Sequence, residues 1–247
     1  MNLGTSIKHQ LRRFGIEVKH LDYGLDLWLD LQELFTNRLP ETVIDVGANE
    51  GQTSLHLTRL FPDARFWAFE PNPVTLQRLR VAVASNPQIT PVGVALGAHQ
   101  MQANLQITGS SVNASLLPYD KPSGTDAVQN EATVQVTTLD VFALEHDIVT
   151  VDLLKVDAQG YDLEVLKGAD RLLREGRIHA LVVEVNFVQM YAGQAWFYEI
   201  YDLAHSRGLR FCGLYDVRHE DQFHLQWGDA LFVLPDWAGT RSARKPK

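Results

Sequence analysis

The sequence predicts an α/β fold in which a mostly parallel sheet carries helices on both faces. From residue 42 onward, short apolar runs of strand length alternate with segments of helical periodicity, a pattern typical of βαβ units. A glycine turn directly follows the first run, and an acid directly follows the second. With 247 residues the chain can bury one substantial core, so we expect one main domain over residues 41–236.

The elements follow from these patterns in order. Apolar residues at mostly helical spacing predict a first helix over residues 22–38, within an N-terminal helical cap of residues 1–40 that covers one flank of the sheet. Apolar runs predict strands at 42–47, 65–69, 89–94, 152–157, 179–185, 209–215 and 229–234. Helical periodicity predicts further helices at 51–60, 73–85, 161–174 and 194–207.

Residues 95–144 interrupt this alternation. Two β-like pieces at 103–107 and 133–138 flank a long polar loop from Gly109 to Asn130. Because the chain then returns to the same sheet pattern, we interpret the segment as an insertion near the ligand-binding edge and not as a second domain.

Composition excludes several classes of function. A formal net charge of −8 leaves no diffuse basic surface for phosphate neutralisation, so we expect no nucleic-acid partner. Basic residues cluster only in a C-terminal tail, residues 237–247. Cys212 is the sole cysteine, no signal-peptide pattern opens the chain and no run could span a membrane, so we expect a cytoplasmic protein. The oligomeric state stays open.

The turn from Asp45 to Gly51 is typical of a nucleotide site, and its spacing indicates which nucleotide. The glycines stand as Gly-x-x-x-Gly, and the carboxylates of Asp45 and Glu50 would oppose the pyrophosphate of a dinucleotide. The ammonium group of a sulfonium amino acid would be attracted to Asp45, directly or through water, while Gly47 lets its methionine portion approach. The turn therefore favours S-adenosylmethionine.

Two further segments fit the same ligand. Glu70 ends the second strand and can accept two hydrogen bonds from a ribose diol, although an acid before Pro71 could also serve a helix N-terminus. Ala95, with the two residues after it, would form a wall beside the adenine.

Carboxylates at the ends of the fourth and fifth strands are the candidates for chemistry. Lys155 and Asp157 alternate along the fourth strand, so their side chains share one face and can pair. We expect Asp157 to orient or deprotonate an acceptor hydroxyl, although it could instead be a helix cap or a salt-bridge partner. Glu184 could act with it as a second acid or base, or as part of an oxygen-ligand metal site, but no compact ligand motif is present and we expect no metal.

Three blocks together resemble the FkbM-type methyltransferases. They are Ile44 to Gly51, Phe69-Glu70-Pro71 and, most specifically, Leu154 to Gly168, within a match that covers residues 40–234. The resemblance implies a Rossmann-like class I methyltransferase sheet of seven strands, mostly parallel with the last antiparallel. It also implies methyl transfer from S-adenosylmethionine to a hydroxyl oxygen of a sugar, glycan or natural-product small molecule.

Carried onto this chain, the resemblance places the cofactor at Asp45, Gly47, Asn49, Gly51 and Glu70, with Asp157 at the acceptor end. Adjoining residues complete our set of candidate cofactor-binding residues: Ala48, Pro71 and Ala95. Family members often have glutamate where this chain has Gln159, and again where it has Asp162. The first change makes Gln159 a poor general base, which leaves that role to Asp157 or Glu184.

Two alternatives from other classes remain open on the sequence alone. A nicotinamide-dependent oxidoreductase could also present Glu70 to a ribose, although the turn is unsuited to its phosphates. A non-catalytic module that binds S-adenosylmethionine on the same fold would carry the same cofactor residues.

Overall fold

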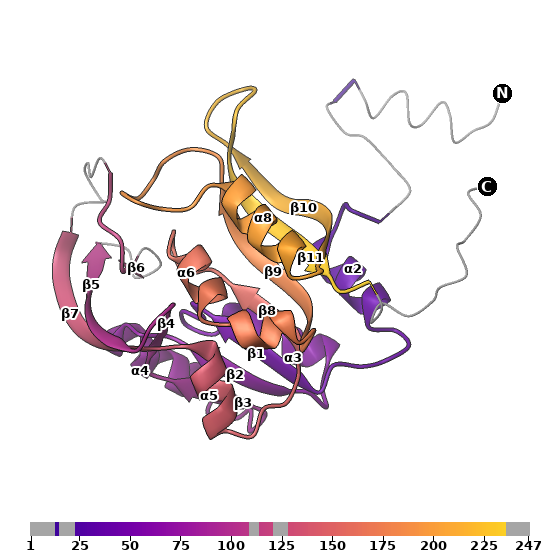
Figure 1. The fold of residues 1–247 in the computed structure, drawn as a ribbon, viewed down its shortest axis with the longest axis horizontal. Coiled ribbons are helices and arrows are strands. Elements are labelled where there is room, and N and C mark those ends of the chain that lie inside the picture. Colours follow the sequence, from indigo (N-terminus) through magenta and orange to yellow (C-terminus); the bar gives the residue numbers. More distant parts are fainter. Residues whose placement is uncertain (1–12, 15–22, 109–113, 121–127, 236–247) are drawn as a thin grey trace.

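The computed structural model describes residues 13–14, 23–108, 114–120 and 128–235 (Figure 1). Most of the N-terminal segment before residue 23, parts of the predicted loop at 109–130 and the predicted basic tail at 237–247 therefore lie outside the described residues. None of the helices among the described residues combines the length and apolar character needed to cross a bilayer. The division into a cap, a domain and a tail stays a prediction.

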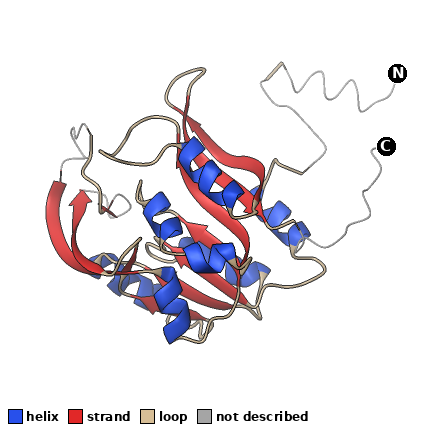
Figure 2. Ribbon diagram, viewed as in Figure 1, coloured by secondary structure: helices blue, strands red, loops and turns tan. Residues whose placement is uncertain are grey.

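A seven-stranded sheet forms the centre of the molecule (Figures 1 and 2). Its order is β10-β11-β9-β8-β1-β2-β3, and β11 runs antiparallel to both neighbours while the other pairs are parallel. The predicted sheet, mostly parallel with its last strand antiparallel, is confirmed. The strands are β1 Thr42–Val46, β2 Arg65–Phe69, β3 Ile89–Val92, β8 Val151–Val156, β9 Ile178–Asn186, β10 Arg210–His219 and β11 Leu225–Val233.

Helices cover both faces of this sheet, as the sequence predicts (Figure 2). One face packs against α2 Leu27–Leu34, α3 Gln52–Leu60 and α4 Pro73–Ala82. The other face packs against α5 Leu139–Glu145, α6 Asp162–Lys167, α7 Asp170–Arg174 and α8 Phe197–Ser206. Because both faces are buried, the central strands are apolar on both sides, and a polar side chain within them is an exception that needs an explanation.

Three helices differ from the prediction. The helix expected over 22–38 is confined to α2, because the side chain of Asp26 caps its start by accepting the N–H groups of Trp28 and Leu29. The helix expected over 161–174 breaks into α6 and α7 at Gly168, where a Cβ would lie 2.0 Å from the carbonyl oxygen of Gly97. The start of α7 is held by Asp140, whose carboxylate accepts the N–H groups of Arg171 (2.7 Å) and Leu172 (3.1 Å). Asp140 belongs to α5, a helix of 7 residues that periodicity could not separate from the strand-like run before it.

The insertion forms a second sheet of its own, with the order β4-β7-β5-β6. Its strands are β4 Ala95–Leu96, β5 Met101–Thr108, β6 Ala114–Ser115 and β7 Val128–Thr137. The long pair β5 and β7 extends well beyond the two β-like pieces that we predicted, because the polar residues on its outer face hide the alternation. A small apolar cluster around Leu105 and Val134 holds this sheet together.

The turn after β1 is fixed by both neighbouring strands. The N–H groups of Gly47 and Ala48 donate to the carbonyl of Phe69 at 3.0 and 2.9 Å, and Asp157 N–H donates to Val46 at 3.0 Å. Gly47 has φ +76, and a Cβ there would lie 1.9 Å from the carbonyl oxygen of Asp157. This glycine is therefore required by the close approach of two strand ends, a constraint that the sequence prediction had attributed to the cofactor.

We expect Gly47→Ala to destabilise the fold far more than Gly193→Ala, which serves as its matched control. Gly193 has a similar φ of +79 but nothing within 4 Å of its Cβ position, so that variant carries only the conformational cost of about 1–2 kcal/mol. Gly47→Ala adds a clash with backbone and should cost at least about 3 kcal/mol more. Urea denaturation measures both, and equal losses would contradict the close packing of β1 against β8.

Candidate functional site

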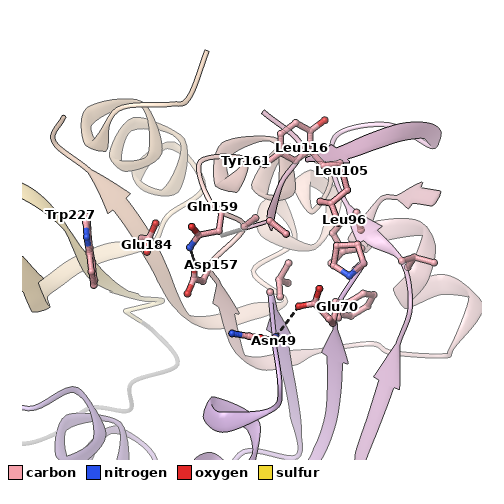
Figure 3. Close-up of a pocket in the computed structure, with 18 residues that line it drawn as sticks. Asn49, Glu70, Leu96, Leu105, Leu116, Asp157, Gln159, Tyr161, Glu184 and Trp227 are labelled. Atoms are coloured by element: carbon pink, nitrogen blue, oxygen red, sulfur yellow. Dashed lines mark hydrogen bonds between the residues drawn. The ribbon is translucent and has the colours of Figure 1, made fainter. Parts of the chain in front are cut away.

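A cavity of about 280 Å³ lies at the carboxyl ends of β1, β2 and β8, where open α/β sheets bind ligands (Figure 3). Seven of the ten residues predicted for the site line it: Gly47, Asn49, Glu70, Pro71, Ala95, Asp157 and Glu184. The insertion contributes Leu105 from β5, Ala114 from β6 and the neighbouring Leu116, so it does lie at the ligand-binding edge.

Glu70 is held at the end of β2 by two backbone donors. Its carboxylate oxygens accept the N–H of Asn49 at 3.0 Å and the N–H of Asn72 at 2.8 Å. Burial raises the pKa of this carboxyl to about 7, and the two N–H donors oppose that effect. Each oxygen keeps a lone pair for a further donor, which is the arrangement that a ribose diol requires.

Asn49 forms the turn between β1 and α3 in a left-handed conformation, with φ +50. The hydrogen bond from its N–H to Glu70 holds this unusual backbone geometry in place. Its side-chain Oδ1 atom is buried and accepts no hydrogen bond within the described part of the chain. A buried acceptor without a donor is costly, so a ligand that donates a hydrogen bond would relieve it.

The opposite wall of the cavity is apolar. Phe69, Leu96 and Leu105 are all buried and line the cavity. Leu96 and Leu105 lie on the side away from Asp157 (Figure 3). Flat apolar surface beside a pair of sugar-binding oxygens suits a purine base, because the base can be buried there while its ribose reaches Glu70.

Asp157 stands at the end of β8 and is oriented by two side chains. Its Oδ2 pairs with the ammonium of Lys155 at 2.9 Å, as predicted, and its Oδ1 accepts from the amide of Gln159 at 2.8 Å. The side-chain carbonyl of Gln159 in turn accepts a hydrogen bond from the hydroxyl of the buried Tyr191 at 2.7 Å. Both ends of the Gln159 amide are therefore hydrogen-bonded, and its backbone is held in a strained turn with φ +51.

Several carboxylates face the same side of the sheet as Asp157, toward α2 and α3. Asp45 is opposite Lys155 in the β1–β8 register, and Glu184 is opposite Asp229 in the β9–β11 register. Burial and the negative charges of Asp157 and Asp162 raise the pKa of Glu184 well above its usual value. Burial has the opposite effect on Lys155, whose pKa it lowers. The neighbouring carboxylates raise that pKa by more than burial lowers it, so Lys155 stays charged.

Three predicted cofactor residues do not line the cavity. Asp45 is fully buried behind the turn, where its carboxylate accepts the Ser54 hydroxyl at 2.6 Å. Ala48 packs into the core beneath α3, and Gly51 is the N-cap of α3 with its Cβ position 2.8 Å from Leu79. These three residues support the turn from the core side, whereas Gly47, Asn49 and Glu70 line the cavity.

Asp162 is a residue whose role the sequence did not indicate. It is fully buried, and its carboxylate accepts the N–H groups of Ala158 at 2.7 Å and Gly160 at 3.0 Å. Those bonds hold the turn that carries Asp157 and Gln159. The sequence does place Asp162 five residues after Asp157, at the start of a predicted helix. An ordinary helix-capping acid stands at the same position, so the sequence alone could not show this role.

The lining of the cavity fits S-adenosylmethionine. Glu70 would hold the ribose, the apolar wall would hold the adenine, and the orphaned Oδ1 of Asn49 offers an acceptor to a donor group of the ligand. The carboxylates of Asp157 and Glu184 lie at the far end, where a positively charged sulfonium centre would be favoured.

Comparison with known proteins agrees with this geometry. The model of the methyltransferase FkbM domain matches residues 45–211. The chain belongs to the FkbM methyltransferase family. The family predicted from the three sequence blocks is thereby confirmed, and so is S-adenosylmethionine as the cofactor.

Curated relatives of this FkbM methyltransferase are distant. Methyltransferase sdnD of Sordaria araneosa is 29% identical over 194 residues, covering 63% of this chain and 75% of its own. The 2-O-methyltransferase NoeI of Sinorhizobium fredii is 23% identical over 208 residues, covering 80% and 84%. Hexuronic acid methyltransferase AglP of Haloferax volcanii is 28% identical over 144 residues, covering 58% and 54%.

We expect Glu70 to make stability depend on pH. The folded pKa of about 7 exceeds the ordinary value of 4.5, so the folded state keeps a proton that the unfolded state has released. The contribution is complete below about pH 4.5 and is lost as the pH rises to about 7, a decline of up to about 3 kcal/mol.

The measurement is the free energy of unfolding in urea at about pH 5, 6, 7 and 8, for the native chain and Glu70→Gln. The native chain should lose stability relative to Glu70→Gln as the pH rises, because the amide of the variant cannot ionise. Glu145→Gln, at an exposed glutamate on α5, is the control and should show a constant difference. A constant difference for Glu70→Gln as well would contradict the raised pKa of Glu70.

Proposed function

We propose that this methyltransferase transfers the methyl group of S-adenosylmethionine to a hydroxyl oxygen of a sugar, glycan or natural-product small molecule. The observation that carries the proposal is the placement of Asp157. Its carboxylate is ion-paired and doubly oriented, and it lies with Glu184 at the end of the cavity opposite the ribose-binding Glu70. A carboxylate in that position suits an acceptor that must lose a proton.

Methyl transfer is an in-line displacement, and bound S-adenosylmethionine supplies the electrophilic methyl carbon. The acceptor oxygen forms the new bond to that carbon while the electron pair of the broken carbon–sulfur bond stays on sulfur. The main contribution of the chain is to position the hydroxyl opposite the sulfur, since proximity alone can lower such a barrier by several kcal/mol.

Asp157 takes the hydroxyl proton as the new bond develops. A carboxylate is a weak base toward a free alcohol, but the alcohol becomes acidic once its oxygen begins to bond to the methyl carbon. Lys155 and Gln159 hold the two carboxylate oxygens at 2.9 and 2.8 Å, so the side chain cannot turn away from the acceptor. Each oxygen retains a lone pair that can accept the proton.

Glu184 would orient the same hydroxyl from the neighbouring strand. Burial raises its pKa, which favours the protonated carboxyl, and a protonated carboxyl can donate a hydrogen bond as well as accept one. It therefore complements Asp157, which remains paired with an ammonium.

The relatives support oxygen as the acceptor atom without naming the substrate. NoeI carries the name of a 2-O-methyltransferase, which gives oxygen as its acceptor atom, and AglP that of a hexuronic acid methyltransferase, which gives a sugar acid as its acceptor. Membership in a methyltransferase family sets aside the nicotinamide oxidoreductase. Cytoplasmic location and the lack of a nucleic-acid partner stay predictions from composition.

The experiment is incubation of the full chain with isotopically labelled S-adenosylmethionine and pooled glycans and secondary metabolites, followed by mass spectrometry. The proposal expects the label on the oxygen of an alcohol. Label on nitrogen or carbon would overturn it, and cofactor binding without label in any pool would favour a non-catalytic binding module.

We expect Asp157→Asn to lower the rate of label transfer at least about 100-fold, because the amide cannot take the proton. Its affinity for S-adenosylhomocysteine, measured by calorimetry, should change less than about threefold. Asp63→Asn, which removes the same charge at an exposed position, is the control and should retain full activity. Full turnover in Asp157→Asn would show that this carboxylate is not the base.

A further inference from the structure

A second cavity, of about 290 Å³, lies between the sheet and the helices α2 and α3. It is separate from the lining that we assign to ribose and adenine, but the two cavities share Asp157, Glu184 and Trp227. They therefore meet at the carboxylates to which we assign the chemistry. An acceptor in the second cavity could present a hydroxyl to Asp157 while the cofactor occupies the first.

The second cavity is strongly acidic. Besides Asp157 and Glu184 it is lined by Asp216 of β10 and Asp229 of β11, against the single ammonium of Lys155. That ammonium is already ion-paired with Asp157. Within the described part of the chain, no hydrogen bond or ion pair joins Asp216, Asp229 or Glu184 to a donor side chain.

Glu184 is the observation that points to a ligand. Only 7% of the residue is exposed, it lines both cavities, and its carboxyl has no hydrogen-bond partner among the described residues. Figure 3 shows it on the Asp157 side of the first cavity. A buried carboxyl without a partner costs free energy, and a cationic or hydrogen-bond-donating ligand would recover it. Burial also raises the pKa of Asp229 to about 6, which is consistent with a carboxyl that lacks a partner.

A metal ion does not match this arrangement. Among the described residues, no three histidine, cysteine, aspartate or glutamate side chains come together closely enough to hold one. The carboxylates instead come from four different strands or strand ends, at β8, β9, β10 and β11, and Trp28 and Trp227 line the same cavity. Dispersed acids with aromatic walls suit an organic cation that also carries a ring or carbon skeleton.

We propose that the second cavity is the acceptor subsite and that it selects an acceptor bearing a protonated amine, such as an amino sugar. This inference rests on the proposed function, because the hydroxyl of the same molecule must reach Asp157. The ammonium group would lie among Asp216, Asp229 and Glu184, and the ring would lie against the tryptophans. An anionic acceptor such as a uronic acid would instead meet like charges on several sides.

The test compares three probes of nearly equal shape and different charge: glucosamine, glucose and glucuronate. Each is titrated by ligand-observed NMR into the full chain loaded with S-adenosylhomocysteine, at about pH 7 and low salt, where such charge effects are least screened. We expect glucosamine to bind at least about tenfold more tightly than glucose, and glucuronate to bind most weakly.

Two variants locate the amine. Asp216→Asn and Asp229→Asn should each reduce the preference for glucosamine over glucose by about threefold to tenfold, with unchanged affinity for glucose and S-adenosylhomocysteine. Asp216 has φ +48, a conformation that asparagine adopts readily, so its variant should fold. Asp202→Asn, at an exposed position on α8, is the matched control and should keep the full preference.

Equal affinity for glucosamine and glucose would overturn the inference, as would a preference that survives in the Asp216→Asn/Asp229→Asn double variant. A loss of glucosamine binding on adding magnesium chloride, with no such loss on adding sodium chloride of equal ionic strength, would also overturn it, in favour of a metal site. Failure of the proposed function would be seen separately, as a lack of label transfer to any hydroxyl, because the sugar titrations require no turnover.

Discussion

The ion pair between Lys155 and Asp157 is the interaction on which the site depends. Lys155 is buried beside Asp45, Asp157 and Asp229, whose negative charges keep it protonated against the cost of burial. The positive charge of its ammonium in turn lowers the free-energy cost of placing these carboxylates together on one side of the sheet. Without it the core would hold several uncompensated carboxylates, a situation that costs several kcal/mol and that proteins avoid.

The fold brings this pair to the ligand through the contact between β1 and β8. Because Gly47 lets the backbone at Asp157 approach closely, the turn that presents Asn49 and the strand end that presents Asp157 are parts of one rigid structure. The cofactor residues and the proposed base are therefore positioned together. The neighbouring strands β8 and β9 carry Asp157 and Glu184 to the junction of two cavities, one suited to a nucleoside and one rich in carboxylates.

The sequence predicted the seven strands and the cofactor edge because both follow from local patterns, apolar runs and a turn that ends in Gly51. It could not predict contacts between distant segments. The close approach that requires Gly47 depends on Asp157, 110 residues later, and the hydrogen bond from Tyr191 that fixes Gln159 spans 32 residues. Local periodicity also could not show that Asp45 would turn inward to Ser54, since a strand residue beside a turn can face either side.

We expect Glu70 and Asp157 to mark the two ends of one methyl-transfer site, and a crystal structure of the complex with S-adenosylhomocysteine would show whether they do. We expect both ribose hydroxyls within hydrogen-bond distance of the Glu70 carboxylate and the adenine against Leu96 and Leu105. We also expect the sulfur to face Asp157 and Glu184. A nucleoside bound away from Glu70, or a sulfur directed away from Asp157, would contradict it.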